Sequence, residues 1–343
     1  MFSNSPNSER LDVLTSIWKR AFQRDRMGPN DNFLSIGGDS EIASLIAAEI
    51  KAFSGREISP LLVLQASTIS SLANLLAKPE LPAVSAILPL NDSSQGPPIF
   101  MAHGIGDTIV NLLPLASRLQ SSFAIYGMQA PGVDGVREPL NRIEKMAEYH
   151  VAAVRQVQPH GPYFLIGYSM GGLVVLEMAR LLSEAGEEIG LLAMLDSYPD
   201  RRYFALRQRI RWELRQTRRR SADLWRRFKA FALQPPRSKN FQLTSGSLAA
   251  AMMRTRAAQY QALRAYRPRY YQGEVRFVRA ATASYFPADP TPIWRRLVGE
   301  LEVEVIPGDH LEMLNAQVEA LASLLRCLLP QTLGTETTLR LVV

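Results

Sequence analysis

The chain has 343 residues, of which 47% are hydrophobic and 21% charged, and its formal net charge is +7. This length suits two globular domains, and no apolar run has the roughly 18–20 residues that a membrane span needs. The single cysteine, Cys327, excludes a disulfide framework and a cysteine-based metal cluster, and the polar N-terminus has no signal-peptide core, so we expect a cytoplasmic protein without a metal site.

Residues 9–79 are predicted to form a small helical domain, after a disordered N-terminal segment of residues 1–8. Apolar residues recur there at the spacing of one helical face. The three stripes are Leu11, Leu14, Ile17, Trp18 and Phe22, then Ile42, Leu45, Ile46 and Ile50, then Ile69, Leu72, Leu75 and Leu76. In residues 80–97 prolines, a serine pair and a glycine interrupt every pattern, so we expect a linker that runs into a first edge strand.

Residues 98–330 alternate between predicted strands and predicted helices. The expected strands are PIFMAH, FAIYGM, YFLIGY, GLLAMLD, EVRFVRA and LEVEVI, and helices are expected near residues 111–119, 142–157, 171–185 and 315–328. This order predicts a mostly parallel sheet with helices on both faces. A long helical insertion is expected over about residues 199–265, and residues 331–343 are expected to be a C-terminal tail.

Ser40 lies in DNFLSIGGDS, where an amphipathic helix is about to start. No histidine precedes His103, and a serine without a neighbouring base is a poor nucleophile. Free N–H groups at a helix N-terminus favour an anion such as a phosphate on the side chain. The alternative is that Ser40 or Asp39 is an ordinary helix N-cap.

The region of residues 9–78 resembles a peptidyl carrier domain, a small four-helix domain that carries 4′-phosphopantetheine on the serine of this motif. The resemblance implies that Ser40 is the attachment point and that a phosphopantetheinyl transferase is a partner. Glu41 stands where that family usually has an apolar residue directly after the serine.

A second serine, Ser169, lies in GYSMG between the predicted strand YFLIGY and a predicted helix. A serine on such a strand-to-helix turn is exposed and strained, and the glycines let neighbouring backbone pass close by. We predict that Ser169 is a nucleophile; the alternative is a structural turn.

Two further residues follow in the order Ser, Asp, His that is typical of this turn. Asp196 ends the strand LLAMLD and is the expected acid that orients an imidazole, unless it only caps the next segment. His310 follows the strand LEVEVI and is the expected general base. Less suitable alternatives are Asp200, Asp309, His103, His150 and His160.

An oxyanion hole needs two N–H donors near the nucleophile. The loop HGIG, residues 103–106, follows the strand PIFMA, and the helix after Ser169 begins with Met170. We expect the backbone N–H groups of Ile105 and Met170 to form the hole; the alternative is a glycine-rich turn without a catalytic role.

Residues 95–330 resemble the thioesterase domain that ends non-ribosomal peptide synthetases, an α/β-hydrolase. The matching segments are PIFMAHGIGD, FLIGYSMGGLVVLEMA, LLAMLDS, YRPRYYQGEVRFVRA and IWRRLVGELEVEVIPGDHLEML. The resemblance implies that Ser169, Asp196 and His310 form a catalytic triad and that the insertion is the family's helical lid.

The two resemblances together predict a carrier–thioesterase pair. An acyl or peptidyl thioester on the Ser40 arm would transfer to Ser169 and leave by hydrolysis or cyclisation, supplied by upstream synthetase modules or other carrier domains. Alternatives are a proofreading thioesterase that acts in trans, a polyketide-type release or Claisen-cyclising domain, and a non-catalytic carrier scaffold. The intact triad argues against the scaffold.

Positive charge is concentrated in residues 200–229, which hold about a dozen Arg or Lys. With Trp212, Trp225 and Phe228, this segment is either a solvated basic surface or a dock for an acidic carrier surface or an anionic acyl chain. No nucleic-acid-binding motif accompanies the charge, so we expect no nucleic-acid partner.

Overall fold

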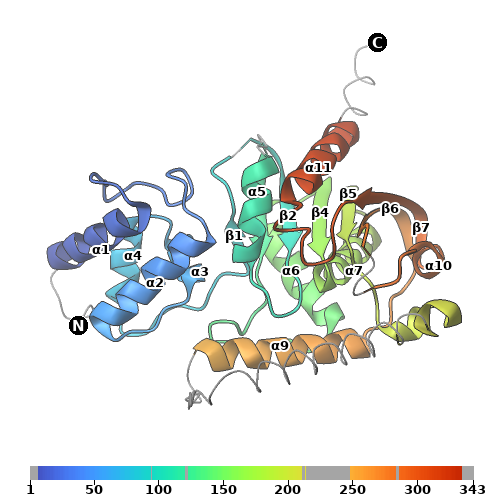
Figure 1. The fold of residues 1–343 in the computed structure, drawn as a ribbon, viewed down its shortest axis with the longest axis horizontal. Helices are drawn as coiled ribbons and strands as arrows, with labels where there is room; N and C mark the ends of the chain where they lie inside the picture. The colour runs from blue at the N-terminus through green and yellow to red at the C-terminus, as the bar shows by residue number, and fades with distance from the viewer. Residues whose placement is uncertain are drawn as a thin grey trace, which may run out of the picture.

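A computed structural model describes residues 7–93, 95–119, 123–210, 213, 248–282 and 286–333. Figure 1 shows a small helical domain beside a larger domain that is built on a sheet. Trp212, Trp225 and Phe228 lie outside the described residues. Within the described residues, no helix has both the length and the apolar character needed to cross a membrane.

The N-terminal domain consists of four helices, α1 (Asn7–Phe22), α2 (Ser40–Ser54), α3 (Pro60–Ala66) and α4 (Ile69–Leu76). Helix α1 begins inside the segment expected to be disordered, so that expectation was wrong for its last two residues. Most residues of the predicted apolar stripes are buried between the helices, which is why these faces are apolar. Leu45 is an exception, because it is 44% exposed.

The larger domain contains a seven-stranded sheet in the order β1-β3-β2-β4-β5-β6-β7. The strands are β1 (Ile87–Pro89), β2 (Gln95–Ala102), β3 (Phe123–Met128), β4 (Tyr163–Tyr168), β5 (Ile189–Leu195), β6 (Tyr271–Ala280) and β7 (Val298–Ile306). Only the edge strand β1 pairs antiparallel, and all other neighbours are parallel. The predicted α/β-hydrolase fold with a mostly parallel sheet is thus confirmed.

Helices cover both faces of the sheet (Figure 1). The described helices of this domain are η1 (Ile109–Leu112), α5 (Leu113–Leu119), α6 (Ile143–Val157), α7 (Met170–Glu184), η2 (Arg201–Tyr203), α9 (Leu248–Ala265), α10 (Thr291–Trp294) and α11 (Val318–Leu333). Side chains of β2 alternate between the two faces: Ile99 and Met101 belong to the core with α5 and α11, while Phe100 belongs to the core with α6 and α7. Helix α11 runs three residues into the expected C-terminal tail.

The helical domain packs against the sheet domain. Its buried residues form one continuous apolar cluster with the face that carries α5 and α11. Two polar contacts also join the domains: the Ser85 N–H donates to Gln65 Oε1 at 2.8 Å, and the Leu248 N–H donates to Glu57 Oε2 at 3.1 Å. The second contact places the start of α9 against the helical domain (Figure 1).

Candidate active site

Ser169 stands on the sharp turn between β4 and α7. Its backbone has φ 56° and ψ −121°, a conformation that costs a non-glycine residue on the order of 1–3 kcal/mol. The turn is possible because glycines flank it: a Cβ on Gly167 would overlap the backbone of Gly171, and one on Gly171 would overlap the Ala102 carbonyl. The serine is thereby held at the carboxyl edge of the sheet, beside the start of α7.

Asp196 and His310 meet at the same edge. Asp196 directly follows β5, His310 follows β7, and His310 Nδ1 lies 2.9 Å from Asp196 Oδ2. An ionised carboxylate only accepts hydrogen bonds, so Nδ1 is the donor and Nε2 keeps its lone pair. Both side chains are buried, which shields this hydrogen bond from water.

The structure separates the expected acid from its alternatives. Asp200 accepts a hydrogen bond from Arg202 Nε at 2.8 Å, and Asp309 accepts one from the Leu311 N–H at 2.9 Å. Asp196 is the acid that bonds the imidazole of His310.

Tyr168 connects the turn at Ser169 to this imidazole. Its ring stacks on the His310 ring with centroids 4.9 Å apart, and its hydroxyl donates to the His310 carbonyl at 2.7 Å. The ring of Phe286 lies edge-to-face with the His310 ring, with centroids 4.9 Å apart. Because Tyr168 directly precedes Ser169, the stacking holds the imidazole next to the serine. Neither aromatic residue was predicted from the sequence to belong to the site.

The loop after β2 passes directly over Ser169. A Cβ on Gly104 would lie 3.3 Å from Ser169 Cβ. Among the described residues, the Ile105 N–H has no hydrogen-bond partner, and the Met170 N–H, as the first of helix α7, has no intrahelical acceptor. The two N–H groups expected to form an oxyanion hole are thus both placed near the serine and available.

His103 supports this loop rather than acting as a base. Its Nδ1 lies 2.8 Å from the Gly104 carbonyl oxygen, and its Nε2 accepts a hydrogen bond from the Ala130 N–H at 3.3 Å. Burial lowers the pKa of His103, so the ring stays neutral with its proton on Nδ1. Nearby, burial raises the pKa of Asp107, which the sequence analysis did not single out.

Ser40 is the first residue of α2, and Asp39 is its N-cap. The Asp39 carboxylate accepts hydrogen bonds from the Glu41 and Ile42 N–H groups at 3.0 and 2.9 Å. These N–H groups are therefore not free for a phosphate, contrary to the argument from the helix N-terminus. Ser40 itself is half-buried, and it lines two cavities, so there is space beside its side chain.

Two cavities adjoin Ser40, with volumes of about 350 and 610 Å³. Ser40, Pro114 and Asn315 line both of them. The smaller cavity also reaches Asp107 and Tyr168, next to the turn that carries Ser169. Ser40 and the candidate catalytic edge thus line a common space between the two domains.

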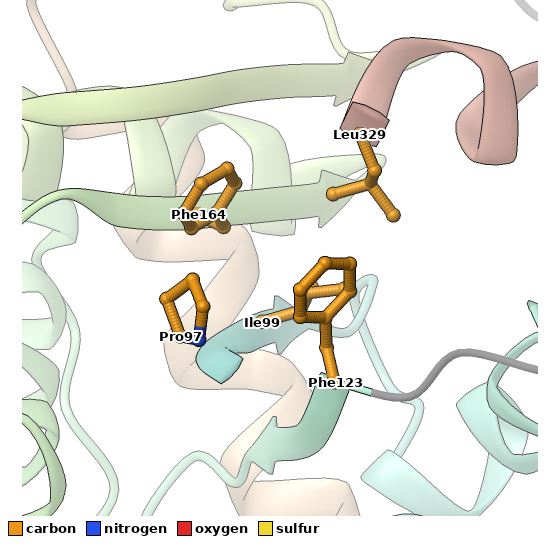
Figure 2. Close-up of a pocket in the computed structure, with 5 residues that line it drawn as sticks. All are labelled: Pro97, Ile99, Phe123, Phe164 and Leu329. Carbon is orange, nitrogen blue, oxygen red and sulfur yellow. The ribbon is translucent and has the colours of Figure 1, made fainter. Parts of the chain in front are cut away.

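A tight apolar pocket lies elsewhere in the sheet domain (Figure 2). Pro97, Ile99, Phe123, Phe164 and Leu329 point into it. The strand residues among them stand near the amino ends of β2, β3 and β4, away from the edge that carries Ser169. The pocket has no polar lining and no room for a water molecule, so it is part of the packing rather than a reaction site.

No group of three or more His, Cys, Asp or Glu side chains in the described part of the chain is arranged to hold a metal ion.

Comparisons with known proteins find matches to two family models, one in each domain of the chain. A model described as thioesterase domain matches residues 97–328, and one described as phosphopantetheine attachment site matches residues 12–76. A dimodular nonribosomal peptide synthase of Bacillus subtilis (strain 168) is 35% identical over 197 residues, which are 57% of this chain. The chain spans 8% of the length of that synthase.

Solved structures share the fold. A holo four-domain nonribosomal peptide synthetase bound to AMP and glycine matches with a TM-score of 0.58 at 22% identity, over 95% of this chain and 26% of that one. The NocB thioesterase domain, in covalent complex with a fluorophosphonate nocardicin G analogue, matches with a TM-score of 0.53 at 23% identity, over 71% of this chain and 99% of that one.

Proposed function

Because the chain belongs to the thioesterase domain family and carries a phosphopantetheine attachment domain ahead of it, we propose that it releases an acyl or peptidyl chain from a phosphopantetheine thioester. Ser169 is the nucleophile, His310 the general base and Asp196 the group that orients His310. Ser40 carries the 4′-phosphopantetheine, and the two cavities that it lines support this role.

The reaction proceeds in two halves on the residues of the sheet edge. The bound arm supplies a thiol that holds the acyl chain as a thioester. His310 Nε2 takes the proton of Ser169 Oγ while this oxygen attacks the thioester carbonyl, and the N–H groups of Ile105 and Met170 bind the resulting oxyanion. His310 then gives its proton to the departing sulfur, leaving an acyl-enzyme on Ser169.

The second half uses the same groups on a new nucleophile. His310 takes a proton from water, or from an amine or hydroxyl of the acyl chain itself, while this group attacks the acyl carbonyl. His310 then returns the proton to Ser169 Oγ as the acyl–Ser169 bond breaks. Water gives a free acid, and an internal nucleophile gives a ring. Asp196 stabilises the imidazolium of His310 in both halves.

The observation that carries this proposal is the 2.9 Å bond between His310 and Asp196 beside the strained serine turn. Ser40 and that edge line the same cavity. This favours release from the chain's own carrier domain over proofreading in trans. Upstream synthetase modules would load the arm after a phosphopantetheinyl transferase has attached it, and we place the activity in the cytoplasm.

A fluorophosphonate probe tests the nucleophile. We expect the wild-type chain to be labelled and Ser169→Ala to remain unlabelled. Intact mass spectrometry after phosphopantetheinylation tests the arm, which should be added to the wild type and not to Ser40→Ala. If the wild-type chain did not react with the probe, the proposal would be wrong and the chain would be a non-catalytic carrier scaffold. Attachment of an arm to Ser40→Ala would exclude Ser40 as the attachment point.

A further inference from the structure

Helix α9 contacts the loop over Ser169 through Gln259 and Arg256. The Gly106 N–H donates to Gln259 Oε1 at 2.8 Å. Gly106 has φ +75°, and a Cβ there would lie 3.0 Å from Arg256 Cδ, so the loop and the helix pack closely. Gln259 is 1% exposed, so water does not compete for its bond to Gly106.

With this bond, the peptide groups on both sides of Ile105 are held by hydrogen bonds. On one side, the Gly104 carbonyl oxygen lies 2.8 Å from His103 Nδ1. A trans peptide group points its C=O and N–H in opposite directions, so the Ile105 N–H is turned away from His103. On the other side, the Gly106 N–H is held by Gln259. Among the described residues, the Ile105 N–H between them is left without a partner.

The other end of the Gln259 amide indicates why this residue is a glutamine. Its Nε2 is buried and has no hydrogen-bond partner among the described residues. Exchanging the amide oxygen and nitrogen would place a donor against the Gly106 N–H, so the orientation is fixed by the loop. An unpaired buried donor costs stability. A residue that served only to fill the space would be apolar, whereas the amide is needed to hold Gly106.

We propose that Gln259 is a positioning residue for the oxyanion hole. By holding Gly106, it aims the Ile105 N–H at the oxygen of the tetrahedral intermediate on Ser169. This inference rests on the proposed function. Because Gln259 stands on α9, within the predicted lid insertion, any displacement of this helix acts directly on the oxyanion hole.

The test uses the full-length chain and the thioester octanoyl-N-acetylcysteamine, which bypasses the carrier arm. Gln259→Met and Gln259→Leu fill the space without an acceptor for Gly106. A misplaced donor costs roughly 10- to 100-fold, so kcat should fall by about that factor while KM stays within about twofold. Thr255→Val is the matched control, since Thr255 is 3% exposed on the same helix and its hydroxyl bonds Ala251.

A trifluoromethyl ketone with an octyl chain gives a second readout, because its adduct on Ser169 places an oxyanion in the hole. Its inhibition constant should rise in the Gln259 variants by the same factor as kcat falls. An unaltered kcat, or a lower kcat with unaltered inhibition, would overturn the inference. If the proposed function were wrong, the wild type itself would hydrolyse no thioester.

Discussion

His310 donates from Nδ1 to Asp196 across 2.9 Å, although 114 residues separate the two in the sequence. The reason is the sheet: Asp196 follows β5 and His310 follows β7, and one strand, β6, lies between them. Parallel strands end at one edge, so residues after different strands meet there. Tyr168, which ends β4 next to β5, stacks on the imidazole and links this pair to Ser169.

Asp196→Asn should abolish most activity without unfolding the chain. An asparagine amide can present a donor to Nδ1, which favours the tautomer with the proton on Nε2, the wrong one for a base. The expected loss in kcat is roughly 10⁴-fold, the size found when this interaction is broken in a triad. Hydrolysis of octanoyl-N-acetylcysteamine measures it.

Asp200→Asn is the control for this prediction, because Asp200 binds Arg202 and not His310. It should retain near wild-type kcat. Equal losses in both variants would mean that the Asp196–His310 bond has no special role.

Much of the fold could be predicted from the sequence, because buried parallel strands appear there as short apolar runs between turn residues. The strands FAIYGM and YFLIGY are observed at residues 123–128 and 163–168, as expected. Ser169, Asp196 and His310 could also be selected from order and context alone, since each follows a strand that is visible in the sequence.

Contacts between distant side chains could not be predicted. Gln259 and Gly106 are 153 residues apart, and no pattern around either indicates the other. The stacking of Tyr168 on His310 depends likewise on packing in three dimensions. The prediction of free N–H groups at the N-terminus of α2 was wrong for a local reason. The Asp39 carboxylate accepts hydrogen bonds from the Glu41 and Ile42 N–H groups.

Glu57→Ala should slow transfer from the chain's own carrier domain. The Glu57 carboxylate accepts the Leu248 N–H across the domain boundary, and a bond of this kind is worth about 1 kcal/mol, or roughly fivefold. Tethering supplies a high effective concentration, so we expect a loss of about two- to fivefold in single-turnover release from acyl-loaded carrier. Hydrolysis of octanoyl-N-acetylcysteamine, which needs no docking, should not change.

Glu49→Ala is the matched variant, since Glu49 bonds Arg20 within the helical domain. It should leave both rates unaltered. A loss of the same size in the two assays for Glu57→Ala would contradict a docking role and point to damage at the active site.

Glu177→Gln should destabilise the sheet domain. Glu177 is 1% exposed on α7, and it accepts hydrogen bonds from Arg180 Nη2 at 2.8 Å and Arg269 Nη2 at 2.5 Å. Burial opposes its ionisation, but the hydrogen bonds of these arginines outweigh burial and lower the pKa of Glu177. Removing its charge leaves the buried Arg180 paired only with Glu184, which should cost about 1–3 kcal/mol in free energy of unfolding.

Urea unfolding followed by circular dichroism checks this prediction. Glu184→Gln is the comparison, because Glu184 pairs with the same Arg180 from an exposed position. That change should cost less than about 1 kcal/mol. Similar midpoints for the two variants would show that burial of Glu177 does not set the strength of the pair.

His150→Leu should flatten the dependence of stability on pH in the acid range. His150 is buried on α6, and burial lowers its pKa from 6.5 to about 3. Between these values the unfolded chain binds a proton that the folded chain does not. The free energy of unfolding therefore falls as pH falls below 6.5, by about 1.4 kcal/mol per pH unit for this one group.

Urea unfolding of the wild type and His150→Leu at pH 8, 6.5, 5.5 and 4.5 measures how protonation of His150 contributes to the free energy of unfolding. Other titrating groups, including His103 with its own lowered pKa, are common to both chains and cancel in the difference. At pH 8 the imidazole is neutral in both states, so any gap there reports packing alone. From pH 6.5 downward the wild type should lose stability more steeply than the variant. Parallel curves would mean that His150 takes up its proton without unfolding, and that α6 does not bury this ring against solvent.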